Sequence, residues 1–445
     1  MKSEELILPK VLILNQPFNN ETGGGITLTN LFSSWDKDKI AVLCPAYLID
    51  NRTQGTICSN YYQLGSKEHW WALPFRLMAR KYASGPIEVR AKNENNLTVK
   101  KSATRVSFIK NYLNPFLNKL GLSHGISKYH LSPELKKWID QFNPDVIYAQ
   151  AQRRENLLFC NTIQQYLGKP MVFHMMDDWV EFVPKGKFLG KDWHKQIDED
   201  FKLVLGNSVL HLSISDLMAK EYSRRYGYEF QAYHNPINSE FWKKGQKRTY
   251  ELSSSPEILY AGRLGLGINE SLKLMANAIS FLNKKLNLSM KFVIQSSQSE
   301  DWMGDFDVIS HRPFVAYSEL PFKFGEADFL YLPYEFSSEA IKYFQLSMPT
   351  KASEYMICGT PIVIVAPPQT ALVKYAERYA WAEIVTSNRL EDLIDALELL
   401  LKDKERRRKI GETAISIAEK RHDGNTVRKE FMNQLALLSG FSIDR

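Results

Sequence analysis

The chain has 445 residues, of which 44% are apolar and 24% charged, and this is the composition of a globular protein. No apolar run approaches the roughly 18 residues that span a bilayer, and the length exceeds one ordinary core, so two or three domains are expected. The formal net charge of +7 makes anionic surfaces and anionic substrates candidate partners.

The cysteines and the first residues bear on the cellular compartment. The opening stretch MKSEELILPK has two acids and no apolar core, so we expect no secretory signal and a cytoplasmic protein. Four cysteines lie far apart, which fits a reducing compartment and neither a disulfide framework nor a zinc site. They are Cys44, Cys58, Cys160 and Cys358.

The first half of the chain alternates short apolar runs with helical patterns. Strands are expected within 11–14, 39–45, 143–150, 169–179 and 207–214, each bounded by turn residues. The last of them leads to a helix cap at Ser215 and Asp216. Alternation of this kind is typical of parallel sheets with crossover helices.

The pattern restarts after a polar, turn-rich stretch at 243–256, which reads as a hinge. Strands are expected within 257–265, 290–296, 327–334 and 382–387, and helices within 269–286 and 389–420. Two doubly wound parallel α/β domains are therefore predicted, at 1–242 and 257–420. Ligands of such sheets bind beyond the carboxyl ends of the strands, and the main cleft is expected between the domains.

A stretch in the second half, SMPTKASEYMICGTPIVI (347–364), predicts a short helix that begins near Pro349 and ends at Gly359, followed by a strand. The helix N-terminus is a candidate phosphate site, and Lys351 adds a full positive charge to it. Glu354, one turn further on, suits the vicinal diol of a ribose. The alternative is that Lys351 and Glu354 form an ordinary pair on a helix surface.

A second candidate for anion binding lies in YAGRLG (260–265). Arg263 follows a predicted strand and stands between glycines, where its planar fork can grip a diphosphate with two hydrogen bonds. This second site weakens the interpretation of Lys351 and Glu354 as a surface pair.

Positive charge gathers between residues 61 and 140, which contain fourteen Lys or Arg and five Asp or Glu. Aromatic residues are interleaved with this charge at 70–82 and 108–120. Such stretches suit an anionic membrane surface or an anionic substrate. The alternative is a solvated face over ordinary core aromatics. Nucleic acid is not expected as a partner, because the segment is not organised as a recognition motif.

Four stretches together resemble the GT-B glycosyltransferases of glycosyltransferase family 4: YAGRLG, SMPTKASEYMICGTPIVI, HNPIN (234–238) and TGGGITLTN (22–30). The resemblance spans nearly the whole chain. It implies two Rossmann-like domains and a retaining, metal-independent enzyme that uses a nucleotide-activated sugar. It also implies that the segment 421–445 forms a helix that crosses back onto the first domain.

The resemblance implies roles for particular residues. Arg263 and Lys351 would neutralise the donor diphosphate and carry catalysis, and Glu354 would bind the ribose. Backbone amides or a hydroxyl would come from Ser347, Met348 and Thr350.

In the first half, the resemblance places Gly24 and Gly25 in a loop after the first strand, where the backbone would approach the sugar phosphate. His174, or Asp177 together with Asp178, would lie near the transferred sugar and the acceptor. For His174 the alternative is a satisfied core histidine.

Three departures from the family pattern concern charged groups. The position eight residues before Glu354, where the family has a glutamate, is Leu346. The position five residues after Arg263, where a lysine is common, is Ile268, and Lys273 is the next candidate. Met176 stands where the family has a histidine, two residues after His174.

The expected function is transfer of a sugar from a nucleotide donor to a glycan or lipid-linked acceptor, in bacterial surface polysaccharide or glycoconjugate biosynthesis. No metal or other cofactor is expected, and peripheral attachment to the inner membrane would follow from segment 61–140. One alternative is a metal-dependent transferase that uses Asp305 and Asp307. Others are a further GT-B activity, such as an epimerase or phosphorylase, and a non-catalytic protein that binds membrane surfaces.

Overall fold

A computed structural model describes residues 8–89, 124–183, 187–188, 191–265 and 267–440. The chain forms two compact units. The N-terminal unit contains Met1–Ile214, Ala219–Tyr233 and Arg428–Arg445, and the C-terminal unit contains Ser215–Met218 and His234–Val427. The chain therefore passes between the units four times, and the final helix begins in one unit and ends in the other.

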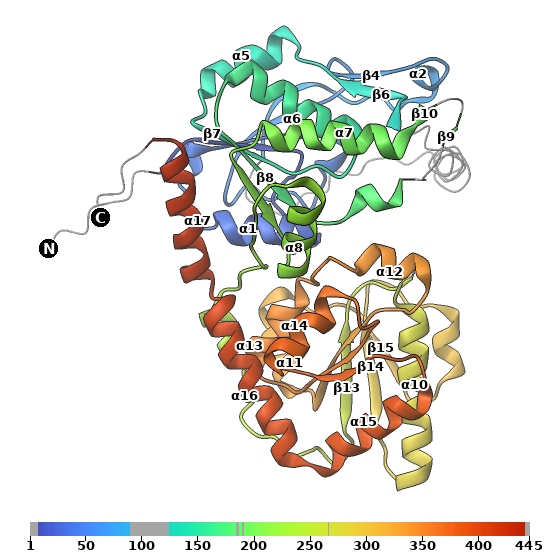
Figure 1. The fold of residues 1–445 in the computed structure, drawn as a ribbon. Coiled ribbons are helices and arrows are strands. Elements are labelled where there is room, and N and C mark those ends of the chain that lie inside the picture. Colours follow the sequence, from blue (N-terminus) through green and yellow to red (C-terminus); the bar gives the residue numbers. More distant parts are fainter. Residues whose placement is uncertain (1–7, 90–123, 184–186, 189–190, 266, 441–445) are drawn as a thin grey trace, which may run out of the picture. The chain divides into compact units, whose positions relative to one another are not determined.

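The N-terminal unit is built on an eight-stranded sheet (Figure 1). Its neighbouring strands are parallel except for the edge pair β3 and β5, which is antiparallel. An antiparallel edge strand is common in otherwise parallel sheets. In spatial order the strands are β12 (Phe230–Ala232), β11 (Leu210–Ser213), β8 (Met171–Met175), β7 (Val146–Ala149), β1 (Val11–Leu14), β2 (Ile40–Pro45), β3 (Asn60–Leu64) and β5 (Gly85–Glu88).

Helices connect these strands, and the local sequence explains where they begin. Thr22, Ser132 and Asp192 cap the helices that follow them, since each side chain accepts a hydrogen bond from an amide of the first turn. The helices are α1 (Gly23–Phe32), α2 (Phe75–Met78), α5 (Pro133–Phe142), α6 (Arg154–Leu167), α7 (Trp193–Gly206), α8 (Asp216–Tyr226) and α17 (Gly424–Leu438).

The C-terminal unit has a six-stranded sheet in which every neighbouring pair is parallel. In spatial order the strands are β15 (Ile309–Arg312), β14 (Lys291–Gln295), β13 (Glu257–Ala261), β16 (Phe329–Pro333), β17 (Ile362–Val365) and β18 (Glu383–Val385). The helices are α9 (Ser239–Lys243), α10 (Asn269–Leu286), α11 (Leu320–Glu326), α12 (Ser338–Phe344), α13 (Lys351–Cys358), α14 (Ala371–Tyr379), α15 (Leu390–Lys402) and α16 (Lys404–Arg421).

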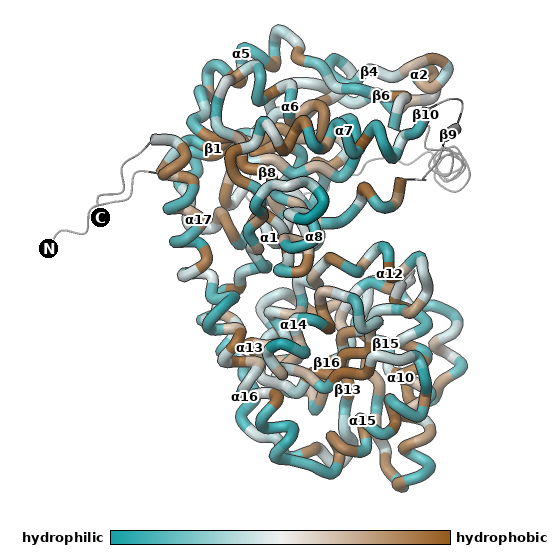
Figure 2. The backbone as a smooth tube through the Cα atoms, in the orientation of Figure 1, coloured by the Kyte–Doolittle hydropathy of each residue, from teal (hydrophilic) through white to brown (hydrophobic). Residues whose placement is uncertain are grey.

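The predicted fold class, two doubly wound parallel α/β domains, is confirmed in both units. Figure 1 shows α10 and α13 on opposite sides of the second sheet, and Figure 2 shows hydrophobic strands inside more hydrophilic helices in each unit. The helix predicted within 347–364 begins at Lys351, two residues after Pro349. It ends at Gly359, whose φ of 72° is a left-handed conformation that glycine adopts without strain.

Short elements were not predicted. They include two antiparallel pairs: β4 (His69–Trp71) with β6 (Ser127–Tyr129), and β9 (Lys187–Phe188) with β10 (Lys191–Asp192). With two or three residues each, such strands show no periodicity in the sequence. Within the part of the chain that the structure describes, no helix is both long and apolar enough to cross a membrane.

The last helix is joined to the N-terminal unit by an aromatic cluster around Phe431. This fully buried ring lies 5.2 Å from Phe32 and 5.9 Å from Tyr148, measured between ring centroids. We expect Phe431→Ala to lower the free energy of unfolding by about 3–5 kcal/mol, because it leaves a cavity among these rings. Chemical denaturation measures the effect. Leu437→Ala is the control in the same helix, since Leu437 is 61% exposed, and an equal loss in both variants would contradict the prediction.

Candidate functional site

The predicted donor-binding residues of the C-terminal unit lie at one edge of its sheet. Strands β13, β16 and β17 are parallel neighbours, so their carboxyl ends share that edge. Arg263 lies two residues beyond β13. Helix α13 runs back from this edge to the start of β17, so its N-terminus, with Lys351, lies there too. The fold thus brings the two predicted cations to the same edge.

The Arg263 side chain is held by aromatic rings. Its guanidinium carbon lies 5.5 Å from the ring centroid of Tyr343 and 5.5 Å from that of Phe344, both in α12. The residue is exposed, and no carboxylate of the described residues pairs with it. A planar cation placed on rings in this way keeps its hydrogen-bond donors for an anionic ligand.

Glu354 and Lys351 do not form an ordinary surface pair, because Glu354 is buried. Its side chain is 6% exposed, and the Lys351 Nζ atom lies 3.9 Å from Oε2. No described residue donates a hydrogen bond to the carboxylate. Burial raises the pKa of Glu354, and the charge of Lys351 acts against that rise. A buried carboxylate without a donor is suited to accept the hydroxyls of a ligand.

The loop before α13 supplies backbone groups to this edge. The Ser347 amide donates to the carbonyl of Phe344 (3.2 Å), so it is already engaged. The amides of Met348 and Thr350 have no partner among the residues that the structure describes. The Thr350 carbonyl accepts a hydrogen bond from the Asn235 side chain (3.4 Å), which ties the loop to the HNPIN segment.

Glu335 is a residue of this edge that the sequence reasoning missed. It lies two residues beyond β16 and is buried, and its Oε1 accepts the Glu270 amide (3.1 Å) at the start of α10. Its own amide donates to the Gly267 carbonyl (2.9 Å). An acid directly after a predicted strand was the available signal. Glu335 therefore supplies a carboxylate to the edge where the expected glutamate is replaced by the buried Leu346.

The position expected to carry a lysine after Arg263 is apolar in structure as well as in sequence. Ile268 is buried. The Lys273 Nζ atom lies 2.8 Å from a carboxylate oxygen of Glu270, so this lysine is paired on the surface of α10.

Gly24 and Gly25 lie in the first turn of α1, and not in a loop as expected. The Thr22 side chain caps this helix and accepts the Gly25 amide (3.2 Å). A Cβ atom on Gly24 would lie 2.8 Å from Oε1 of Gln16, and one on Gly25 would lie 2.3 Å from the Asn19 amide nitrogen. Gly25 therefore has no room for a side chain beside the buried Asn19, whereas the neighbour of Gly24 is the end of a glutamine side chain that can move. Their approach to a sugar phosphate stays a prediction.

His174 lies inside β8 and is fully buried. Its Nδ1 is 2.6 Å from the Tyr148 hydroxyl, and burial lowers its pKa to about 3, so the ring is neutral at physiological pH. This placement favours the alternative of a core histidine. Asp177 is half-buried just beyond the strand. The catalytic roles of His174 and Asp177 stay predictions.

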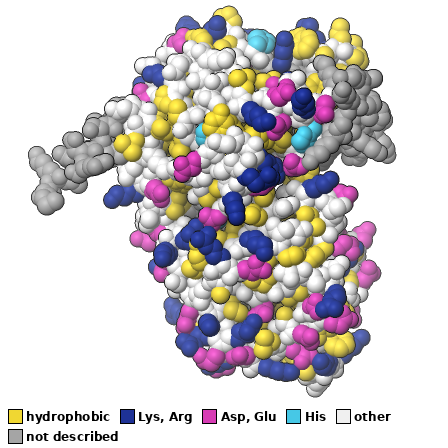
Figure 3. Space-filling view, in the orientation of Figure 1, with side chains coloured by type: hydrophobic (Ala, Val, Ile, Leu, Met, Phe, Trp, Pro, Cys, Tyr) yellow, Lys and Arg dark blue, Asp and Glu magenta, His cyan; other side chains and the backbone are white. Residues whose placement is uncertain are grey.

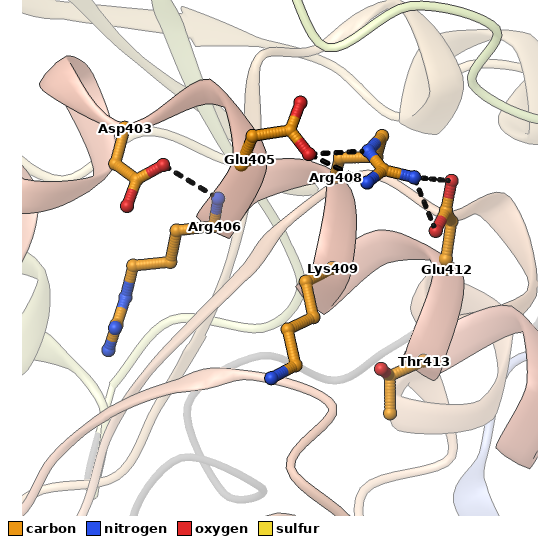
Figure 4. A pocket seen from close by; sticks show the side chains of 7 residues that line it. All are labelled: Asp403, Glu405, Arg406, Arg408, Lys409, Glu412 and Thr413. Carbon is orange, nitrogen blue, oxygen red and sulfur yellow. Dashed lines mark hydrogen bonds and ion pairs between the residues drawn. The ribbon is translucent and has the colours of Figure 1, made fainter.

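Two other places offer charged groups. Asp305 and Asp307 are both exposed, and within the described ranges no three metal-ligating side chains gather. Figure 4 shows a surface hollow lined by α16 and its cap residue Asp403. Arg408 in this hollow is paired with Glu405 (2.6 Å) and Glu412 (3.2 Å), so its charge is compensated within one helix. Figure 3 shows positive and negative side chains interspersed over this unit, and we assign no site there.

Comparison with solved structures identifies the fold. The chain is similar to Anabaena HepE in complex with UDP and glucose, with a TM-score of 0.55 and 13% identity over 96% of this chain and 99% of that one. It is also similar to sucrose-phosphate synthase of Thermosynechococcus elongatus, with a TM-score of 0.60 and 12% identity over 98% and 100%. A third is an α,α-trehalose-phosphate synthase (UDP-forming) of Burkholderia vietnamiensis, with a TM-score of 0.59 and 10% identity over 98% and 100%.

These similarities show that the chain has the GT-B fold of nucleotide-sugar glycosyltransferases, as the resemblance predicted. No protein-family model and no curated protein matches the sequence. Membership of family 4 within this fold stays a prediction.

The raised pKa of Glu354 predicts a pH-dependent stability. Burial disfavours the ionised form of Glu354 in the folded state, so Glu354→Gln, which cannot ionise, is expected to raise the melting temperature at a pH above the raised pKa. As the pH falls through the raised pKa, the wild-type carboxyl takes up a proton and the difference should shrink. Thermal denaturation between pH 4 and pH 8 measures it, with Glu326→Gln, at an exposed acid, as the control. A less stable Gln variant at neutral pH would contradict the prediction.

Proposed function

We propose that the chain is a nucleotide-sugar-dependent glycosyltransferase of the hexosyltransferase type. The observation that carries the proposal is the buried Glu354 carboxylate, which has no hydrogen-bond donor of its own in the described structure and lies beside Lys351. A ribose diol supplies two hydroxyl donors, and the adjacent diphosphate would meet Lys351 and Arg263. The GT-B fold supports this assignment.

Uridine diphosphate sugars are the donors to examine first, because HepE was solved with UDP-glucose and the trehalose-phosphate synthase is described as UDP-forming. Glu354, Met348 and Thr350 would hold the ribose and the phosphates. Glu335 offers a further carboxylate at the same edge for the sugar hydroxyls.

The reaction follows from charge. Departure of the nucleoside diphosphate builds negative charge on its β-phosphate, and Arg263, Lys351 and the N-terminus of α13 would stabilise that charge. We propose that these groups suffice without a metal ion and that the anomeric configuration is retained. In that case the leaving phosphate takes the proton from the acceptor hydroxyl, and no protein nucleophile is required.

The proposed acceptor is a glycan or a lipid-linked saccharide in surface polysaccharide or glycoconjugate assembly. The segment 70–82 supports a location at the inner membrane, because Leu73 and Leu77 are 72% and 77% exposed next to Arg76 and Arg80. Exposed apolar residues beside cations suit an anionic lipid surface. The other basic stretch, 108–120, lies outside the described residues.

Nucleotide binding tests the donor site. UDP at about 100 times its dissociation constant should stabilise the protein by roughly 2.7 kcal/mol, which a thermal shift in the presence of chelator detects. Arg263→Ala, Lys351→Ala and Glu354→Ala each remove a charged hydrogen bond, so each should weaken UDP binding by about tenfold or more. Lys374→Ala, at an exposed lysine paired with Glu377, is the control.

Full UDP affinity in all three variants would refute this donor site. Transfer of a labelled sugar from a nucleotide donor then separates the enzyme from the alternative, a non-catalytic protein that binds membrane surfaces. If the wild type binds UDP and transfers no sugar to any acceptor or to water, the non-catalytic alternative holds.

Vesicle sedimentation tests the membrane location. Leu77→Ser should reduce binding to vesicles with anionic lipids, because it removes an exposed apolar side chain that would enter the interface. Leu437→Ser is the matched control, since Leu437 is an exposed leucine of α17 without neighbouring arginines at this spacing. Equal binding of both variants and the wild type would exclude a role for this stretch.

A further inference from the structure

A second cluster of charged and polar groups lies in the N-terminal unit, at the carboxyl edge of its sheet. Strands β2, β1 and β7 are parallel neighbours there. Tyr47 follows β2, while Arg153 and Glu155 follow β7 at the start of α6. The loop after β1, which leads to α1, ends at the same edge. No role was assigned to Tyr47, Arg153 or Glu155 from the sequence.

The centre of this cluster is an ion pair with one buried and one accessible partner. The Glu155 side chain is 1% exposed, and its Oε1 lies 3.2 Å from Nε of Arg153, which is 43% exposed. Burial raises the pKa of Glu155, and Arg153 acts against that rise. The neighbouring Arg154 is occupied by Asp200 at 2.6 Å. The cations of the cluster are therefore compensated, and the free face of Arg153 reaches the surface.

Two further groups come from the small sheet of β4 and β6, which packs its second strand against α6 (Figure 1). The rings of His69 and Tyr129 are stacked with centroids 4.2 Å apart. The Tyr129 hydroxyl and Nε2 of His69 are buried, and neither has a hydrogen-bond partner among the described residues. Burial, aided by the charge of Arg153, lowers the pKa of His69 to about 4, so this imidazole is neutral at physiological pH.

Tyr47 closes the cluster towards solvent. Its side chain is 38% exposed, and its hydroxyl lies near the Arg153 guanidinium. Burial raises the pKa of Tyr47, and the charge of Arg153 opposes that rise. An accessible aromatic ring can lie against the apolar face of a sugar, and the hydroxyl can share in its hydrogen bonds.

We propose that Tyr47 and Arg153, the accessible members of the cluster, bind an uncharged sugar ring of the acceptor, and that the buried Glu155 positions the Arg153 guanidinium. The cluster combines donors and acceptors without net charge. A phosphate would need an uncompensated cation, and here Glu155 and Asp200 neutralise both arginines. The inference rests on the proposed transferase function and deepens it, since it selects a neutral saccharide over a sugar phosphate as the acceptor.

Ligand-observed NMR on the full chain tests the proposal. The probes are the methyl glycosides of glucose, galactose, mannose, rhamnose and N-acetylglucosamine, together with glucose 6-phosphate, each at millimolar concentration with UDP present. At least one glycoside should bind the wild type. Arg153→Gln and Tyr47→Phe should each lower the affinity for that glycoside by about fivefold or more, which is the range expected when one hydrogen bond to a ligand is lost. Both variants should keep the wild-type UDP affinity.

Three results would overturn the proposal: binding of glucose 6-phosphate alone, no binding of any glycoside, or glycoside affinities that both variants leave unchanged. Lys351→Ala separates this proposal from that of the donor site. The variant should bind UDP more weakly, and its glycoside binding, measured without UDP, should equal that of the wild type. Arg153→Lys is the matched variant for Arg153→Gln, because it retains the positive charge and loses the planar guanidinium group. If Arg153→Lys also loses glycoside binding, the contact depends on the hydrogen-bond geometry of the guanidinium and not on its charge.

Discussion

The parallel pairing of β13, β16 and β17 is the constraint on which the candidate donor site depends. Parallel strands end on the same side, so the residues that follow β13 and β16 meet the N-terminus of the helix that precedes β17. Arg263, Glu335 and Lys351 are separated by up to 88 positions in sequence, and this strand pairing brings them to one edge of the sheet. A change of register in β16 would move Glu335 away from the start of α10, where its carboxylate accepts the Glu270 amide.

The position of α13 is fixed by packing on all sides. Every residue from Ala352 to Cys358 is buried, and a Cβ atom on Gly359 would lie 2.6 Å from Ile415 of α16. The helix therefore cannot shift to relieve the electrostatic cost of Glu354. That cost opposes folding, and the surrounding apolar burial offsets it. A buried carboxylate that has no hydrogen-bond donor in the free protein can accept hydrogen bonds from a ligand. The hydrogen bonds gained in this way would contribute to the affinity for that ligand.

The local parts of the fold could be predicted from the sequence, and the contacts between distant parts could not. The strand at β17 and the left-handed Gly359 follow from residues within one stretch, so their prediction was confirmed. The burial of Glu354 depends on how α9 and α11 pack against α13, which periodicity does not show. The Arg153 and Glu155 cluster was missed because its two tyrosines come from distant parts of the chain. Tyr47 lies in a short turn of helix after β2, and Tyr129 lies in β6, a strand of only three residues.

The two units repeat one arrangement at the start of a helix. Glu354 in α13 and Glu155 in α6 both occupy the first turn, at the carboxyl edge of a parallel sheet, and each is buried beside a partly exposed cation. The positive end of the helix favours the ionised carboxylate in that turn, whereas burial disfavours it, and burial dominates in both. Doubly wound sheets bind ligands at this edge. Under the proposed assignments, the donor would meet Lys351 beside the buried Glu354, and the acceptor would meet Arg153 beside the buried Glu155. One local arrangement, present in both units, would then serve two hydroxyl-rich substrates in one chain.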